Sequence, residues 1–275
     1  MFVIVDVIDE GLKAALGFVR AYRRQAVMFV VAYAAIGTLG ASGLLRLPGP
    51  HWLAGLLVTQ ALDLFRNLIL APIWASAYRF AILGDRERGA FQVDIRTRRV
   101  ALMFVIMAAI TLLGSVAPAL GFDIFPNMTV RRLVVLAALG CALAVKFGAW
   151  WLNARLTIAP AMGAAGTRPD AMDTSWAYTH DGVWRILATM LLIYLPLLCV
   201  SALLVALPDW LALRPGGNRA MVFGVVTLIV SVGLAAITDL VWGTVTGRMA
   251  LRLVKAHRER AAEAARRRKD EVPED

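Results

Sequence analysis

Six windows of the chain are apolar enough and long enough to cross a lipid bilayer as helices, and this feature constrains the fold most strongly. They cover residues 26–45, 53–83, 100–120, 133–152, 185–207 and 221–245. The hydrocarbon core of a bilayer takes about 20 helical residues, and only helices or closed barrels satisfy the backbone polar groups there. We therefore expect an all-α, polytopic membrane protein built as a bundle of six transmembrane helices.

Composition agrees with this expectation and limits the number of domains. Of the 275 residues, 60% are apolar and 17% charged, against about 45 to 50% and about 25% in ordinary soluble domains. The connections are too short for a separate soluble domain of about 100 residues. We divide the chain into an interfacial amphipathic segment (1–25), a six-helix transmembrane domain (26–252) and a charged tail (253–275).

The basic residues of the loops predict the orientation. Lys and Arg gather in segments 13–24, 86–99, 155–185 and 248–269, all on the side that holds both termini. The opposite side has only Arg46, Arg131, Arg132, Arg214 and Arg219. By the positive-inside rule, both termini are cytoplasmic, and we expect a multi-pass protein of the bacterial inner membrane. The net charge of +10 is thereby explained by topology, so we expect no nucleic-acid partner.

Two segments outside the windows predict interfacial helices. Residues 9–24 place Leu12, Leu16 and Val19 at helical spacing, with acidic residues first and basic residues last. This segment lies flat on the membrane or extends the first span. Residues 170–180 form a second such helix, opened by Pro169 and Asp170. In the tail, a basic block at residues 266–269 contacts anionic lipid or is simply solvated.

Two features inside the windows predict how the helices bend and pack. Residues 53–83 would rise about 46 Å as one helix, but a bilayer core is only about 30 Å thick. This window must therefore tilt, bend at Pro72 or extend beyond the membrane. Small residues one turn apart, such as Gly243 and Gly247 in the last window, let helix backbones approach closely.

Five polar residues lie inside the windows and form the candidate interior site: Asp63, Arg66, Asn67, Lys146 and Asp239. Such groups are costly in hydrocarbon and face a partner or a watery cavity. Asp63, Arg66 and Asn67 share one helix face. The two acids and two bases favour ion pairs, Asp63 with Arg66 or Lys146 and Asp239 with Lys146 or an arginine. Alternatively, the basic members receive an anionic group such as a lipid phosphate, or the cluster conducts an ion.

A second set of basic residues predicts lipid-headgroup contacts. Each even-numbered window is followed by a cytoplasmic segment that opens with an arginine: Arg79, Arg155 and Arg248. Arginine forms paired hydrogen bonds to phosphate, and anionic lipids are abundant in the cytoplasmic leaflet. We therefore treat these three arginines as lipid-headgroup candidates.

A motif between the fourth and fifth windows resembles a known family. Its residues are Ala171, Ser175, Trp176, Thr179, Gly182, Trp184 and Arg185, and a second run after the second window comprises Ala71, Pro72, Ala77, Tyr78, Arg79, Leu83 and Gly84. Both resemble the hexahelical membrane domain associated with bacterial glycerophosphoryl diester phosphodiesterases, which also occurs as free-standing relatives. The resemblance covers about residues 5–255 and agrees with six spans and cytoplasmic ends.

The resemblance implies no catalytic residue for this chain. The phosphodiesterase chemistry of that family belongs to a separate soluble barrel that the chain is too short to contain. The chain has no metal-binding carboxylate set, phosphate-binding loop or nucleophile elbow. His51, His180 and His257 lie in different loops, and the adjacent pair His180 and Asp181 is typical of a surface or capping pair. We expect no metal site and no cofactor.

The expected function is therefore non-enzymatic. We expect an inner-membrane protein that supports envelope or lipid homeostasis by holding an anionic phospholipid, or a protein partner at the cytoplasmic face. The alternative is a small transporter or lipid-moving protein that uses the charged cluster inside the membrane. A transporter needs a continuous polar path, yet the outer halves of the windows carry almost no charge. An enzyme of phospholipid metabolism is a third reading, without a nucleophile or metal site to support it.

Overall fold

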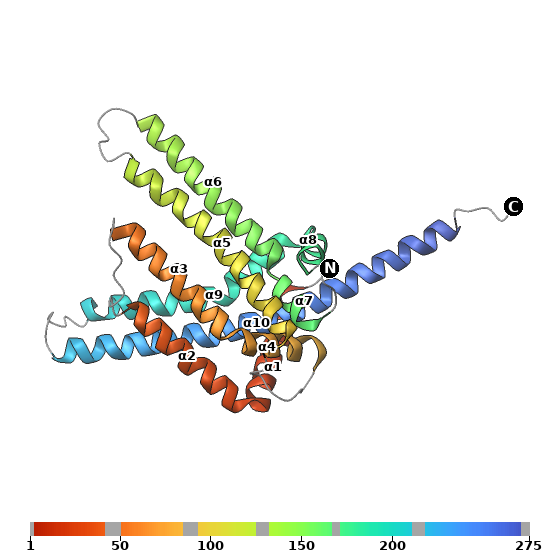
Figure 1. Cartoon of the computed structure of the whole chain (residues 1–275), viewed down its shortest axis with the longest axis horizontal. Coiled ribbons are helices and arrows are strands. Elements are labelled where there is room, and N and C mark those ends of the chain that lie inside the picture. The colour runs from red at the N-terminus through yellow and green to blue at the C-terminus, as the bar shows by residue number, and fades with distance from the viewer. Residues whose placement is uncertain are drawn as a thin grey trace.

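The computed structural model describes residues 3–41, 51–84, 93–124, 132–166, 171–210 and 218–270 (Figure 1). The helices in chain order are α1 (Ile4–Ala21), α2 (Arg23–Ala41), α3 (His51–Ile69), α4 (Ala71–Leu83), α5 (Ile95–Ile124), α6 (Arg132–Leu156), α7 (Ala159–Ala165), α8 (Ala171–Thr179), α9 (Val183–Trp210) and α10 (Asn218–Asp270). None of the described residues lies in a strand. The predicted all-α class is thus confirmed for this part of the chain.

Several of these helices are able to cross a membrane by length and composition. Three do so alone, through the segments Ile95–Val116, Val183–Leu204 and Val222–Arg266 of α5, α9 and α10. The pair α3 and α4 qualifies only as one bent span. The predicted windows 26–45 and 133–152 coincide with α2 and α6. Both windows include side chains outside the described part, so these two helices are not among the spans identified. The described chain is therefore that of a membrane protein with three such helices, or four with the bent pair.

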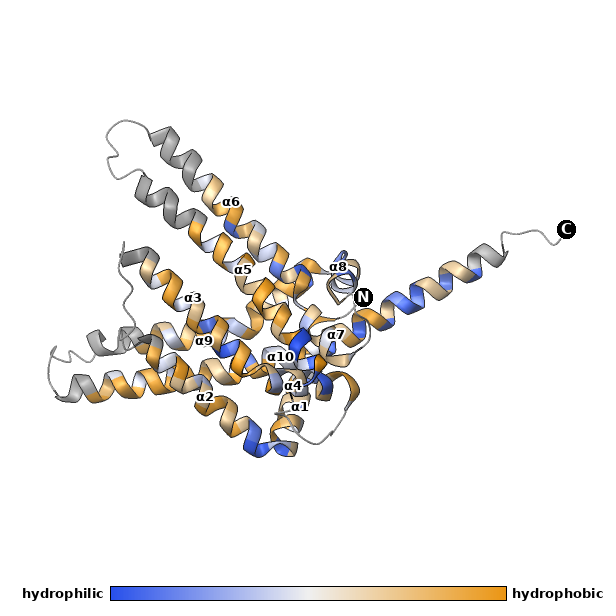
Figure 2. Ribbon diagram, in the orientation of Figure 1, coloured by the Kyte–Doolittle hydropathy of each residue, from blue (hydrophilic) through white to orange (hydrophobic). Residues whose placement is uncertain are grey.

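The outer surfaces of these helices suit hydrocarbon rather than water. Leu113 of α5, Leu203 of α9 and Val222 of α10 are 70%, 65% and 63% exposed. Figure 2 shows hydrophobic residues along α5, α9 and the first half of α10, whereas hydrophilic residues become frequent in the second half of α10. Soluble monomers rarely expose apolar surface so extensively, so these faces agree with helices that cross a membrane.

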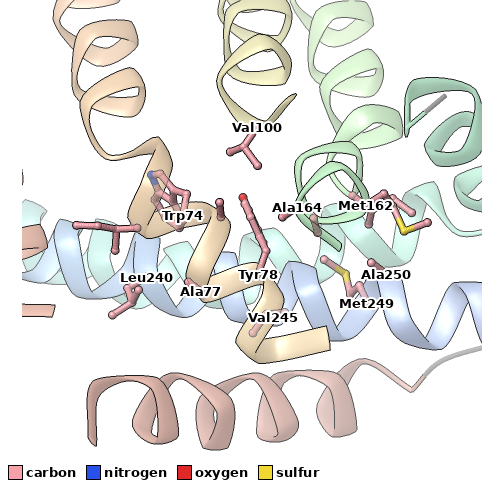
Figure 3. Close-up of a cluster of buried hydrophobic side chains, with 14 of the residues drawn as sticks. Trp74, Ala77, Tyr78, Val100, Met162, Ala164, Leu240, Val245, Met249 and Ala250 are labelled. Carbon is pink, nitrogen blue, oxygen red and sulfur yellow. The ribbon is translucent and has the colours of Figure 1, made fainter. Parts of the chain in front are cut away.

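The long second window bends at its proline, which was one of the three outcomes that its length predicted. Helices α3 and α4 meet at a bend of 60°, and α4 begins at Ala71 with Pro72 in its first turn. Proline has no N–H group and clashes with the carbonyl four residues before it, so the helix cannot run straight through Leu70. The bend turns α4 across α10 and brings Trp74 and Tyr78 into the core (Figure 3).

The buried core lies where α1, α4, α7 and α10 meet. Figure 3 shows Met162 of α7 and Val245 and Met249 of α10 gathered around α4. Close approach of α10 to α4 depends on two glycines. A Cβ on Gly243 would lie 2.3 Å from the Trp74 ring, and one on Gly247 would lie 2.7 Å from Ala81 Cβ. The predicted close packing at these two glycines is confirmed.

Helix α1 differs in extent and in packing from the expected interfacial helix. It begins at Ile4 rather than residue 9, and it ends before Tyr22, where the chain turns into α2 (Figure 1). Leu12 and Leu16, expected on its apolar face, are 43% and 58% exposed. A different face is buried, comprising Val7, Gly11, Ala14, Ala15 and Phe18. This face packs on α10, where the Thr244 hydroxyl donates to the Gly11 carbonyl oxygen (2.9 Å).

Two short helices connect α6 to α9. Helix α7, with Pro160 in its first turn and Gly166 at φ 71° after its end, is separate from α6. Helix α7 was not predicted from the sequence. Helix α8 coincides with the short helix predicted at residues 170–180, although the expected opening residues Pro169 and Asp170 lie outside the described part.

Helix α10 continues without a break across the expected boundary at residues 252 and 253. The first turns beyond it contact the rest of the protein, since the His257 ring lies 4.6 Å from the Tyr178 ring. Arg260 also donates to Asp181 at 3.0 Å. Described residues from Ala261 to Arg266 are exposed.

Candidate functional site

A cavity of about 390 Å³, here called the inner cavity, lies between α3, α4, α5, α6, α9 and α10. Its polar and aromatic wall residues are Gln60, Asp63, Arg66, Asn67, Trp74, Tyr78, Phe104, Thr111, Trp150, Asn153, Thr157, Tyr194, Asp239 and Trp242. Four of the five polar residues predicted for the interior site thus line one cavity. Lys146 is exposed and does not line it.

One predicted ion pair is present at the cavity wall. The Arg66 guanidinium lies 3.1 Å from a carboxylate oxygen of Asp63, one turn away on α3. The same guanidinium lies over the Tyr33 ring, with 4.1 Å from Cζ to the ring centroid. Arg66 Nε is buried without a hydrogen-bond partner. The Asp63 carboxylate thus neutralises Arg66, and the tyrosine ring orients it.

Asp239 has tyrosines as partners instead of the expected Lys146 or arginine. The hydroxyls of Tyr33 and Tyr194 each donate to one of its carboxylate oxygens, both at 2.7 Å. No described Lys or Arg lies within ion-pair distance of this carboxylate. Among the described residues, Asp239 in the cavity wall therefore has two neutral hydrogen-bond donors and no cationic partner.

Sequence reasoning missed both tyrosines. Tyr33 and Asp239 lie 206 residues apart, and nothing in a helical pattern brings α2, α9 and α10 together at these positions. One signal was available, because a tyrosine hydroxyl within an apolar span needs a hydrogen-bond partner. An acid in another span is such a partner.

The α5 and α6 side of the cavity carries a further polar pair that was not predicted. Asn153 Nδ2 donates to the Thr111 hydroxyl oxygen at 2.8 Å, while Asn153 Oδ1 has no partner. The indole N–H of Trp74 is also buried without a partner. The wall therefore combines aromatic faces with hydrogen-bonding groups that the described protein leaves unused.

A second site, here called the Arg155 site, forms where α6 ends. It consists of Arg155, Trp151, Trp176, Ser175 and Thr179. The Ser175 hydroxyl donates to the Arg155 carbonyl oxygen at 2.7 Å. The Thr179 hydroxyl lies 3.0 Å from the same oxygen and 2.7 Å from the Ser175 carbonyl oxygen, so the two carbonyls share its proton. This carbonyl belongs to the last turn of α6, where the helix itself supplies no partner. The motif residues of α8 thus cap α6.

The Arg155 side chain is buried between tryptophans without an anion. Its Cζ lies 4.2 Å from the Trp176 ring centroid and 5.3 Å from that of Trp151. The residue is only 2% exposed, and Nε and Nη1 have no hydrogen-bond partner. Among the described residues, no carboxylate lies within ion-pair distance. A buried cation without a counter-ion is costly, although stacking on two indoles offsets part of that cost.

The remaining motif residues join α8 to α9. The Gly182 N–H donates to the Thr179 carbonyl, and the Gly182 carbonyl accepts from the N–H of Arg185 (3.0 Å each). Trp184 is 68% exposed and lies 6.1 Å from the Phe147 ring. These residues form the turn that positions α8 against the end of α6.

The other two headgroup candidates lie on the core helices. Arg79 is half-buried on α4 and has an interaction partner. Arg248 is half-buried on α10, with Nε unpartnered, and it contributes to the field around Glu10 on α1. A hydrogen bond from Arg252 is the main cause that lowers the pKa of Glu10, and the charges of Arg252 and Arg248 act in the same direction.

Neither site has the composition of a metal centre. No group of three or more His, Cys, Asp and Glu side chains is close enough to hold a metal ion within the described ranges. His257 packs on Tyr178, and His180 is exposed. The chemistry these sites do offer is recognition: a buried guanidinium between tryptophans, and an aromatic cavity with carboxylates.

No family model, no curated protein and no solved structure matches this chain.

Proposed function

We propose that this chain is a non-enzymatic, multi-pass protein of the bacterial inner membrane that supports envelope or lipid homeostasis by holding an anionic phospholipid at the Arg155 site. The observation that carries the proposal is the buried Arg155 guanidinium, which lacks a counter-ion among the described residues. A lipid phosphate supplies the missing charge and accepts the unused N–H groups.

The surroundings of Arg155 suit a headgroup at the membrane surface. Trp150, Trp176 and Trp184 are 53%, 41% and 68% exposed around the end of α6 and the start of α9. Exposed tryptophans are typical of the boundary between hydrocarbon and headgroups. Because Trp176 is partly exposed and lies against the guanidinium, rotation of its ring opens Arg155 to a lipid of the adjacent leaflet.

The proposal includes an architecture of six spans with both termini cytoplasmic. Figure 1 supports it, since α2, α3, α5, α6, α9 and the first half of α10 all extend to the same side of the region that holds α1, α4, α7 and α8. The excess of basic residues lies in the segments on the other side of those helices. The resemblance to the hexahelical phosphodiesterase-associated domain agrees with this order, and the cap formed by Ser175 and Thr179 gives its motif a physical role.

Lipid analysis of the purified protein tests the proposal. Wild type, Arg155→Gln and Arg258→Gln would be extracted from the same membranes, and bound phospholipids quantified by mass spectrometry. Arg258 is exposed, so its variant makes the same charge change away from the site. Enrichment of anionic phospholipid in wild type and Arg258→Gln, lost in Arg155→Gln, supports the proposal. Equal enrichment in all three, or none in wild type, contradicts it.

A small transporter or lipid-moving protein is the second candidate, and the inner cavity favours it. Transport requires a binding site within the membrane that opens to either side in turn. The cavity provides such a site with Asp63, Arg66 and Asp239 in its wall. If the protein instead binds a protein partner at the cytoplasmic face, neither the Arg155 site nor the inner cavity should hold a lipid. The same lipid analysis therefore distinguishes lipid binding from a protein partner.

A further inference from the structure

We propose that the inner cavity binds an organic cation, a molecule with an ammonium or comparable charge on an apolar body. This inference does not depend on the Arg155 site. That site consists of other residues and is proposed to bind an anion. It rests on the charge, the walls and the size of the inner cavity.

The charged groups of the cavity wall leave one negative charge in excess. Asp63 and Asp239 are the acids of the wall, and Arg66 is its base. Arg66 is paired with Asp63 at 3.1 Å. Among the described residues, the hydroxyls of Tyr33 and Tyr194 are the hydrogen-bond partners of Asp239. Those hydroxyls are neutral donors, so they hold the carboxylate in place without cancelling its charge, and a bound cation would cancel it.

Lys146 would have removed this excess, but the fold places it elsewhere. It is exposed on α6 and does not line the cavity. The sequence suggested a neutral cluster of two acids and two bases that form ion pairs or, alternatively, receive an anion, whereas the described wall has both acids and only one of the two bases. The unused N–H groups of Arg66 and Trp74 would favour an acceptor, so an anionic probe belongs in the test.

The walls are those of a cation site rather than of a water-filled channel. Six aromatic side chains face the cavity: Trp74, Tyr78, Phe104, Trp150, Tyr194 and Trp242. The faces of such rings attract cations, and tryptophan does so most strongly. A single carboxylate beside several rings selects an organic cation over a metal ion, because Mg²⁺ and Ca²⁺ require several oxygen ligands. The volume of about 390 Å³ falls in the range of small-molecule sites.

Two ions of nearly equal size and opposite charge test the inference. Tetraphenylphosphonium and tetraphenylborate would be titrated into purified wild-type protein in detergent, and binding followed by tryptophan fluorescence and calorimetry, with micelle blanks subtracted. We expect saturable binding of tetraphenylphosphonium and none of tetraphenylborate. Saturable binding of tetraphenylborate, or failure of the phosphonium to bind, overturns the proposal without any variant.

Variants locate the binding. Asp239→Asn keeps an oxygen for a tyrosine hydroxyl but removes the charge, so we expect about tenfold weaker tetraphenylphosphonium binding or more. Asp173→Asn, an exposed acid of α8, is the matched control and should bind as wild type does. If Asp239→Asn fails to fold, Trp242→Leu serves instead, because it keeps an apolar side chain and removes one ring. Wild-type affinity in a folded cavity variant overturns the proposal.

Discussion

The guanidinium of Arg155 lies 4.2 Å from the ring centroid of Trp176, and this contact joins the end of α6 to α8. The same α8 caps the last turn of α6 through Ser175 and Thr179. Two neighbouring turns of α8 thus hold one buried arginine by its backbone and by its side chain. The arginine is held in place while its guanidinium N–H groups at Nε and Nη1 stay unused.

Removing the Arg155 charge should change the response of the protein to anionic lipid. Wild type in neutral detergent holds a buried guanidinium without a counter-ion, so added phosphatidylglycerol should raise its melting temperature. A ligand at 100 times its dissociation constant contributes about 2.7 kcal/mol. We expect Arg155→Gln to lose most of this shift in a thermal unfolding assay. Phosphatidylcholine should stabilise both proteins equally, and an unchanged phosphatidylglycerol shift in the variant would argue against the site.

Close packing of α10 on α4 predicts opposite effects for two glycines of one helix. A Cβ at Gly243 would overlap the Trp74 ring, whereas nothing lies within 4 Å of the corresponding position at Gly233. Overpacking costs about 1 to 3 kcal/mol, so Gly243→Ala should unfold at lower dodecyl sulfate fraction in mixed micelles. Gly233→Ala should be neutral or more stable by up to about 1 kcal/mol, because alanine favours helix. Equal effects would show that α10 does not approach α4 so closely.

Acid should weaken the attachment of α1 to α10. The pKa of Glu10 is lowered from its ordinary value of 4.5 in the folded protein, chiefly by the hydrogen bond from Arg252. A lowered pKa stabilises the fold above the ordinary value, and this contribution is lost as the pH falls through the folded-state pKa. The pair is partly exposed, so we expect about 1 kcal/mol or less. Melting temperatures measured between pH 7 and pH 3 should fall more for wild type than for Glu10→Gln, and parallel curves would refute the linkage.

The end of α10 should be dispensable only beyond its last contacts. His257 packs on Tyr178, and Arg260 pairs with Asp181, whereas residues 261–266 are exposed. Deleting residues 262–275 should leave the melting temperature unchanged. Deleting residues 256–275 should lower stability by about 1 kcal/mol, because both contacts are partly exposed. Membrane fractionation should show insertion in both cases, and misfolding of the shorter deletion would contradict this account.

The sequence predicted the features that depend on interactions between residues close together in the chain. Pro72 broke the second window because its ring forbids a straight helix, and Gly243 and Gly247 mark a close helix contact, as small residues do in membranes. Helix α8 was predicted from the residues that flank it, Pro169 before its start and Gly182 after its end. Each of these features depends on residues within a few turns of one another.

The sequence did not predict what depends on the relative rotation of distant helices. Lys146 and Asp63 both lie in apolar windows, but α6 turns Lys146 outward while α3 turns Asp63 to the cavity. Tyr33 and Tyr194 reach Asp239 from two other helices. The apolar residues of α1 did not reveal the face that packs on α10, because that contact depends on Gly11, which admits the close approach of the helix. Helical periodicity assigns residues to one face of a helix, but it does not predict which other helix or cavity that face contacts.

Single-particle cryo-electron microscopy in nanodiscs that contain phosphatidylglycerol, with an antibody fragment bound for alignment, tests the central claim most directly. The account predicts a phosphate-shaped density within hydrogen-bond distance of the Arg155 guanidinium, continuous with acyl-chain density and absent from Arg155→Gln. A wild-type map with Arg155 closed between Trp151 and Trp176, and no density beside it, would contradict the account.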